Sequence, residues 1–164
     1  MLVPEYGKMY EHRYDCRFID RYMPGREADV YVTDRATVVK LFHHEPPFLR
    51  ELEVYQDLLA KNIVSVNEFA VPVLIRWDDE LRAIEMTIVR PPYFLDFAGA
   101  KTDEEYQLLV LHDDEWEDQC VERVKENFDD RWPDVVAAAD AFARATGWVL
   151  MDLHRGNLKF ADDQ

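Results

Sequence analysis

The sequence predicts an α+β fold, with a five-stranded antiparallel sheet and one helix followed by a truncated helical lobe. Two groups of short β-rich runs, residues 17–42 and 70–89, contain tight turns that join neighbouring strands as hairpins. One segment with helical spacing of its apolar residues, 43–62, separates the two groups. Hairpins make the sheet antiparallel, and the helix must cover one of its faces.

Three strands are predicted in the first group. Pro24 and Gly25 predict a turn after the first strand, and Thr33, Asp34 and Arg35 predict a hairpin turn after the second. The three strands are the runs RFIDRYM, DVYV and ATVVKLF, at residues 17–23, 29–32 and 36–42.

The segment 43–62 predicts a helix that begins at two prolines. Pro46 and Pro47 fit its first turn, where a missing amide costs little, and Asn62 can cap its C-terminal end. The apolar residues at helical spacing are Phe48, Leu49, Leu52, Tyr55, Leu58 and Leu59. The last two strands are then predicted at 70–77 and 81–89, with a tight turn between them.

The character of the chain changes near residues 90–100. We therefore predict two parts, 1–95 with the sheet and 96–164 with the helical lobe. In the second part, residues 129–147 predict a clear helix. Pro133 lies in its first turn, Gly147 ends it, and its predicted buried stripe is Val135, Val136, Ala139, Phe142 and Ala143.

Residues 101–130 carry most of the charge of the chain. They hold twelve acidic and three basic residues, which is a net charge of −9 out of −15 for all 164 residues. We predict mostly helical, exposed structure, and a docking face for a basic partner is the alternative. A chain this acidic is repelled by phosphate backbones, so nucleic acid is not an expected partner.

The remaining composition indicates a cytoplasmic protein that does not enter a membrane. No apolar run approaches the ~20 residues that span a bilayer, and the first residues do not resemble a signal peptide. Cys16 and Cys120 are far apart and lack the spacing of metal ligands, so we expect free thiols.

Four residues carry the functional hypothesis. Lys40 lies inside the apolar run TVVKLF, where its side chain either points to solvent or reaches a partner. Glu51 lies beside the apolar stripe of the following helix and could face the sheet. Asp152 follows the apolar run VLM, and Asn157 lies five residues further along, directly after a glycine. The side-chain oxygens of Asp152 and Asn157 can therefore lie around one phosphoryl centre.

These residues, in the runs VVKLF, FLRELEVYQDLL and MDLHRGNLKF, resemble the protein-kinase-like superfamily, which includes the aminoglycoside and other small-molecule phosphotransferases. The resemblance implies that Lys40 contacts the nucleotide phosphates and that Glu51 holds this lysine. It also implies that Asp152 is the catalytic base or orients the substrate, and that Asn157 is a magnesium ligand.

The same resemblance implies a nucleotide site for ATP with magnesium. The backbone of Thr87, Ile88 and Val89 would face the adenine, and the loop that contains Gly25 would cover the phosphates. The expected activity is ATP-dependent phosphoryl transfer to an unknown small-molecule or protein acceptor.

The most serious departure from the family pattern concerns the metal ligands. The family has a second metal-binding aspartate roughly a dozen residues after the asparagine, and only seven residues follow Asn157. Asp162 and Asp163 are the candidates, but a strand leading away from Asn157 would carry them far from the metal. Three alternatives follow: a rebuilt metal site, an inactive pseudokinase that binds nucleotide or a protein partner, and a site completed by a partner chain or a second copy.

Two other hypotheses remain open. Asp152 and His154 could be two ligands of a zinc or iron site, although no third ligand has suitable spacing. The chain could also be an unrelated acidic interaction protein.

Overall fold

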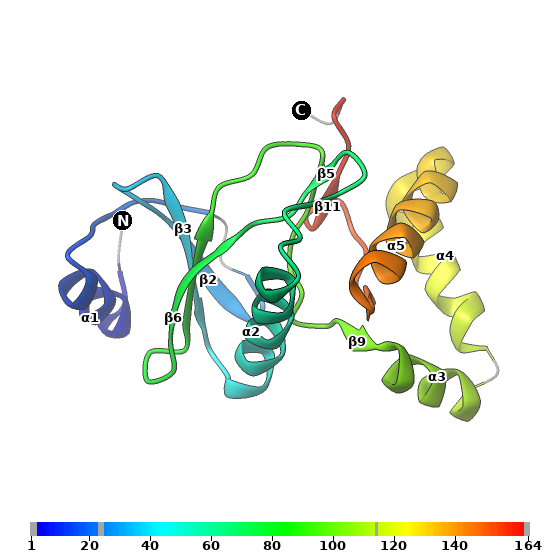
Figure 1. Cartoon of the computed structure of the whole chain (residues 1–164), viewed down its shortest axis with the longest axis horizontal. Coiled ribbons are helices and arrows are strands. Elements are labelled where there is room, and N and C mark those ends of the chain that lie inside the picture. The colour runs from blue at the N-terminus through cyan, green and yellow to red at the C-terminus, as the bar shows by residue number, and fades with distance from the viewer. Residues whose placement is uncertain (1–2, 23–24, 114, 163–164) are drawn as a thin grey trace.

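A computed structural model describes residues 3–22, 25–113 and 115–162 of the chain. Its main sheet has five antiparallel strands in the order β1-β2-β3-β7-β6 (Figure 1), which confirms the predicted fold class. The strands are β1 (Phe18–Arg21), β2 (Ala28–Thr33), β3 (Thr37–Phe42), β6 (Leu74–Asp78) and β7 (Ala83–Thr87).

Two helices, α1 (Glu5–Tyr14) and α2 (Glu45–Ala60), cover opposite faces of this sheet. Side chains alternate along a strand, so Val39 and Leu41 of β3 pack with Tyr10 of α1. Lys40 points to the other face, toward α2. The sequence analysis did not predict α1, because its polar run lacks a clear apolar stripe.

The helix α2 starts and ends close to the predicted positions, with prolines in its first turn and Asn62 left-handed (φ 55°) just beyond its end. Its buried face differs in part from the predicted stripe. Leu49 and Leu59 are about half exposed, at 51% and 46%. The buried residues are Phe48, Glu51, Leu52, Val54, Tyr55 and Leu58, so the face that meets the sheet includes a carboxylate.

Short strands form two further sheets. Neither sheet was predicted, because a strand of two residues shows no alternation, although a strand after Asn157 was expected. One sheet has the order β11-β8-β5-β4, and the other pairs β10 with β9. The strands are β4 (Ser65–Val66), β5 (Phe69–Ala70), β8 (Tyr93–Phe94), β9 (Lys101–Thr102), β10 (Trp148–Val149) and β11 (Leu158–Lys159). The pairing of β8 with β11 brings residues near 95 next to the last described residues.

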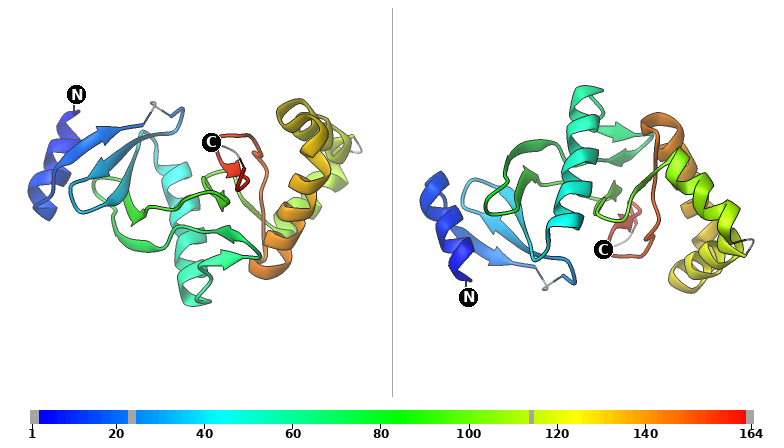
Figure 2. Two further views of the ribbon diagram at one scale, coloured as in Figure 1. Left: turned by 90° about the horizontal axis from the view of Figure 1, so that it is seen from above. Right: turned by 90° about the horizontal axis from the view of Figure 1, so that it is seen from below.

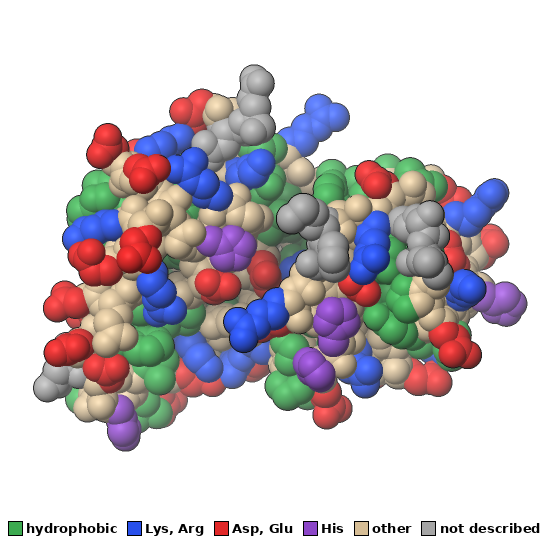
Figure 3. Space-filling view, turned by 180° about the vertical axis from the view of Figure 1, so that it is seen from behind, with side chains coloured by type: hydrophobic (Ala, Val, Ile, Leu, Met, Phe, Trp, Pro, Cys, Tyr) green, Lys and Arg blue, Asp and Glu red, His purple; other side chains and the backbone are tan. Residues whose placement is uncertain are grey.

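The acidic segment is mostly helical and exposed, as predicted. It forms α3 (Asp103–His112), which buries no residue, and α4 (Trp116–Phe128), which buries Val124 and Phe128. Thr102 and Glu105 form a capping box that fixes the start of α3. Asp and Glu side chains are scattered over the face shown in Figure 3 and are not gathered in one patch.

The last helix, α5 (Trp132–Thr146), follows a 3₁₀ turn, η1 (Asp129–Arg131), and ends at Gly147, which is left-handed (φ 83°). Its buried residues are Val135, Ala138, Phe142 and Thr146, so the predicted stripe is shifted by part of a turn. Val136, Ala139 and Ala143 instead border a groove beside α4. Seen from above or below, the helical part and α1 lie at opposite ends of the molecule (Figure 2). In the described part of the chain, no helix has the length and apolar character to cross a membrane.

Asp78 fastens α1 to the turn between β6 and β7. It accepts hydrogen bonds from the Leu81 amide (2.9 Å), Arg13 Nη1 (2.6 Å) and the Tyr14 hydroxyl (2.9 Å). Burial alone would raise the pKa of Asp78, but these donors outweigh it and hold the pKa below its usual value of 3.8.

We expect Asp78→Asn to lower the free energy of unfolding by about 1–3 kcal/mol at pH 7, because a charged acceptor of three hydrogen bonds is lost. An acid with a lowered folded pKa stabilises above its unfolded pKa, and this stability is lost as pH falls through the folded value. Urea unfolding should therefore separate variant and wild type at pH 7 and much less near pH 2. Asp79→Asn, at an exposed neighbour, is the control, and a difference that does not change with pH would contradict the expectation.

Candidate functional site

Lys40 and Glu51 form a buried ion pair between the sheet and α2. Lys40 Nζ lies 2.6 Å from Glu51 Oε1, and the two side chains are 11% and 0% exposed. The alternation along β3 turns Lys40 toward α2, and the turn of the helix points Glu51 back at it. The structure thus brings these two predicted residues together, and the solvent-facing alternative for Lys40 is wrong.

Both members of the pair titrate abnormally because they are buried. Burial raises the pKa of Glu51 to about 7, although the Lys40 ammonium acts in the opposite direction. Burial disfavours the ammonium of Lys40, but the carboxylates of Glu51 and Asp96 outweigh it and raise the pKa of Lys40. Lys40 therefore remains a cation near neutral pH.

Asp152 and Asn157 lie on the loop that follows β10. The Asn157 side chain is buried and holds this loop: its Oδ1 accepts from the His154 amide (2.9 Å), and its Nδ2 donates to the Asp152 carbonyl. The Asp152 side chain is 78% exposed, so its carboxylate is available to a ligand. The Asn157 side chain therefore fixes the backbone of the loop, and the Asp152 side chain remains exposed.

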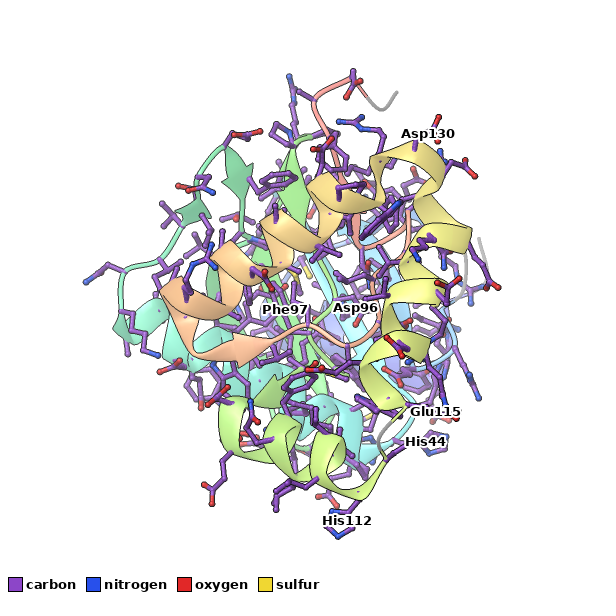
Figure 4. The ribbon with its side chains drawn as sticks, turned by 90° about the vertical axis from the view of Figure 1, so that its right-hand side faces the viewer. His44, Asp96, Phe97, His112, Glu115 and Asp130 are labelled. Atoms are coloured by element: carbon purple, nitrogen blue, oxygen red, sulfur yellow. The ribbon has the colours of Figure 1, made fainter. Side chains whose placement is uncertain are left out.

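A cavity of about 140 Å³ lies beside this loop. Asp152 and Asn157 border it, and Lys40 reaches its edge through Asp96, whose Oδ1 is 3.7 Å from Lys40 Nζ. The lining residues are Glu27, Leu95, Asp96, Gly99, Ala100, Leu150, Met151, Asp152, Leu153 and Asn157. None of the described residues in 101–130 is among them. Figure 4 shows Glu115 and Asp130 at the outer edge of the molecule, and Asp96 with Phe97 near its centre.

Asp96 is a residue of this cavity that the sequence analysis missed. A signal for it exists, because the apolar run Tyr93, Phe94 and Leu95 leads into Asp96 much as the run before Asp152 leads into that aspartate. Phe97 is fully buried and contacts Tyr55 of α2 (ring centroids 5.2 Å apart) and Phe142 of α5 (5.5 Å).

Glu27 adds another carboxylate at the mouth of the cavity, from the segment before β2. Desolvation raises its pKa, and the nearby Asp96 carboxylate raises it further. Three carboxylates and one ammonium leave the cavity edge negative. Phosphates are therefore repelled from it unless cations join them.

The residues at the cavity fit a magnesium ion that arrives with phosphates. Magnesium prefers carboxylate and amide oxygens and commonly takes one or two carboxylates plus substrate phosphates. Asp96, Asp152 and Asn157 offer such oxygens. In the described part of the chain, no group of three His, Cys, Asp or Glu side chains is arranged to hold a metal by itself.

The predicted adenine-facing residues are not part of this cavity lining. The Thr87 amide donates to the Val73 carbonyl, the Thr87 hydroxyl accepts from the Val73 amide, and Ile88 is 43% exposed. Gly25 lies shortly before β2, where its amide donates to the Ala28 carbonyl (3.0 Å) and a Cβ would come within 2.6 Å of that oxygen. The nucleotide contacts of Gly25, Thr87, Ile88 and Val89 stay predictions.

Asp162 binds an arginine and is not among the residues that line the cavity. Its Oδ1 accepts from Arg131 Nη1 at 2.7 Å, near the start of α5. Asp163, the other candidate for the second metal ligand, lies outside the described residues. Leu158 and Lys159 form the predicted strand after the loop.

His154 takes part in the loop itself. Its Nδ1 accepts from the Gly156 amide (3.0 Å), and its Nε2 lies 3.7 Å from Asp152 Oδ2. In the part of the chain that the structure describes, no third His, Cys, Asp or Glu side chain joins Asp152 and His154 to hold a zinc or iron ion.

Comparison with known proteins gives a partial likeness to solved aminoglycoside phosphotransferases. The ADP-bound aminoglycoside phosphotransferase APH(2'')-Ib matches with a TM-score of 0.43 and 18% identity, over 73% of this chain and 36% of that one. The ternary complex of APH(2'')-IIa with streptomycin and ATP matches with a TM-score of 0.42 and 17% identity, over 55% and 31%. The chain thus spans about a third of the length of these structures.

The other two comparisons found no match: no family model and no curated protein matches the sequence. A likeness to solved structures at this level describes a partly shared arrangement of elements and not an activity.

Proposed function

We propose that the chain is an ATP-dependent phosphotransferase with a minimal kinase-like fold. The observation that carries the proposal is the buried Lys40–Glu51 pair, whose ammonium reaches the edge of a cavity bordered by Asp152 and Asn157. Phosphoryl transfer needs charge neutralisation and an oriented nucleophile more than covalent help from the protein. These residues supply both.

Each residue has a role that its position supports. Lys40 binds the nucleotide phosphates, and Glu51 keeps the long lysine side chain in one place. Asp152 accepts the proton of the acceptor hydroxyl or orients that hydroxyl, because its carboxylate is exposed at the cavity. Asn157 offers its amide oxygen to magnesium, which supplies positive charge to the phosphates when bound.

The acceptor in this proposal is a small molecule. A second cavity, of about 130 Å³, lies between α3, α4 and α5, and the loop residues Leu150, Met151 and Leu153 border both cavities. The second cavity is largely apolar, and Asp140 and Tyr106 line part of it. A hydroxyl-bearing compound held there would lie close to the loop that carries Asp152.

The alternative function is a pseudokinase that binds nucleotide or a protein without transfer. One observation favours it: both polar ends of the Asn157 amide are already used within the loop. A carbonyl oxygen has two lone pairs, so Oδ1 can hold a metal as well. We therefore place transfer first and binding alone second.

The test is transfer of the γ-phosphate from ATP, in the presence of magnesium, to a panel of small hydroxyl compounds, to proteins and to water. We expect ADP and a phosphorylated small molecule at a rate well above the same mixture without protein. Nucleotide binding without any turnover would favour the pseudokinase, and neither binding nor turnover would refute both functions.

A further inference from the structure

One tryptophan joins α2 to the segment that leads into the Asp152 loop. Trp148 is 5% exposed, and its Nε1 donates to Asp57 Oδ2 of α2 at 2.9 Å. The guanidinium of Arg50, from the same helix, lies over the indole ring, with its Cζ 5.5 Å from the ring centroid. Arg50 and Asp57 are about two helical turns apart, so they lie on one face of α2. The indole is therefore fixed to this face at two points.

Asp57 and Lys61 also hold the residues just before Trp148. Lys61 Nζ lies 2.6 Å from Asp57 Oδ2 and donates to the Thr146 carbonyl at 2.6 Å. The Trp148 amide donates to the Thr146 hydroxyl (3.0 Å). Burial acts to raise the pKa of Asp57, but the hydrogen bonds from Lys61 and Trp148 outweigh it and hold the pKa below its usual value. Asp57 is therefore a charged acceptor for both donors near neutral pH.

A second connection links Trp148 to α2 through the start of α3. Arg50 Nη2 lies 2.6 Å from Glu105 Oε1, and Glu105 forms the capping box with Thr102. Thr102 is in turn the partner of Trp148 in the pairing of β9 with β10. The contacts thus form a closed ring, in which α2, the start of α3 and β10 hold one another in place.

This ring of contacts lies between the two halves of the proposed site. Glu51, which binds Lys40, follows Arg50 directly in α2. Asp152 is the fourth residue after Trp148, so the position of the indole limits where the loop begins. A displacement of about 1 Å between reacting groups can cost about 10²-fold in rate. The geometry of phosphoryl transfer is therefore sensitive to how Trp148 is held.

We propose that Trp148 is a positioning residue, which sets the place of Asp152 relative to the Lys40–Glu51 pair through its hydrogen bond to Asp57. This inference rests on the proposed phosphotransferase function. Trp148 lines neither the cavity beside the loop nor the apolar cavity between α3, α4 and α5. It therefore acts through α2 and the loop and not by touching a substrate.

The test compares variants that remove this hydrogen bond with variants that keep it. Trp148→Phe keeps an aromatic ring in the core but cannot donate to Asp57. Asp57→Ala removes the acceptor at a side chain that is 33% exposed, so it tests the same bond without a change in the core. Asp57→Asn keeps an oxygen that can accept from the indole. Trp77→Phe, at a tryptophan of the edge strand β6 that is 43% exposed, is the matched control.

For each protein, single-turnover experiments with magnesium and ATP measure the transfer rate, using the acceptor, water included, that gives the highest wild-type rate. Calorimetry measures the binding of a non-hydrolysable ATP analogue with magnesium. We expect Trp148→Phe and Asp57→Ala each to lower the transfer rate by about tenfold, because the loop is displaced, while analogue binding stays at the wild-type value. Asp57→Asn and Trp77→Phe should transfer at the wild-type rate.

The double variant, Trp148→Phe with Asp57→Ala, tests whether the two residues act together. We expect it to be no slower than either single variant, because both changes remove the same hydrogen bond. Losses that multiply in the double variant would overturn the inference, since the two residues would then act separately.

A purely structural tryptophan would give another pattern. Trp148→Phe and Asp57→Ala would then lower the unfolding temperature, and the transfer rate of the folded protein would equal that of wild type. An Asp57→Asn variant as slow as Asp57→Ala would assign the effect to the Lys61 ion pair. Either result would overturn the inference and leave the proposed function standing. A wild-type chain that transfers no phosphate to any acceptor would overturn both.

Discussion

Asp152→Asn is expected to lower the rate of phosphoryl transfer by about 10²–10⁴-fold, which is the usual contribution of a positioned proton acceptor. The carboxylate is 78% exposed and packs against little, so the variant should unfold at the wild-type temperature. The amide cannot accept the proton of the acceptor hydroxyl. Single-turnover measurements of γ-phosphate transfer, with saturating ATP and magnesium, separate this effect from product release.

The matched control is Asp130→Asn, which changes an exposed carboxylate on η1 far from the cavity lining. We expect no change in its transfer rate. If Asp152→Asn kept the wild-type rate, Asp152 would not take part in the chemistry. If it lost its fold, the loop would be a structural element and not a catalytic one.

Glu51→Leu should destabilise the protein by about 3–5 kcal/mol, because it leaves the buried Lys40 ammonium without its carboxylate. This is a large share of the stability of a typical domain. Urea unfolding of the variant and wild type at pH 7 measures the loss. Glu53→Leu, on an exposed position of the same helix, is the control and should have little effect.

The double variant Lys40→Met and Glu51→Leu separates stability from function. Replacing both charges by apolar residues of similar size is often neutral or stabilising, since neither charge has to be desolvated. We expect stability close to wild type and nucleotide binding reduced to background. If the double variant were as unstable as Glu51→Leu, the loss of stability would come from the packing around the pair and not from its charges.

The main sheet and α2 could be predicted because their signals are local. Alternating runs and tight turns mark the strands, and prolines with spaced apolar residues mark the helix. The Lys40–Glu51 pair also follows from local rules: one residue lies on a strand, the other lies beside the buried stripe of the next helix, and the helix must cover the sheet.

The missed features depend on contacts between distant parts of the chain. The strand β8 has two residues and forms only because it pairs with β11 on one side and with β5 on the other. Asp96 belongs to the site through that pairing. Considered alone, its segment is a short apolar run before an aspartate, which many loops contain.

The buried stripe of α5 was misplaced for a related reason. Helical periodicity identifies an apolar side of the helix but not which of two neighbours it meets. Phe142 contacts Phe94 and Phe97, so the most buried line runs through Ala138 and Thr146. Ala139 and Ala143 were predicted in this line and instead border the groove beside α4.

The central claim is that Lys40, Glu51 and the Asp152–Asn157 loop form one site for a metal–nucleotide complex. Calorimetric titration of ATP tests it most directly, with magnesium present and with the metal removed by chelator, on wild type and on the Lys40→Met, Glu51→Leu double variant. The account predicts one ATP per wild-type chain with magnesium, much weaker binding without it, and no binding to the folded double variant. Wild-type protein that does not bind ATP with magnesium, or a double variant that binds it equally well, would contradict the account.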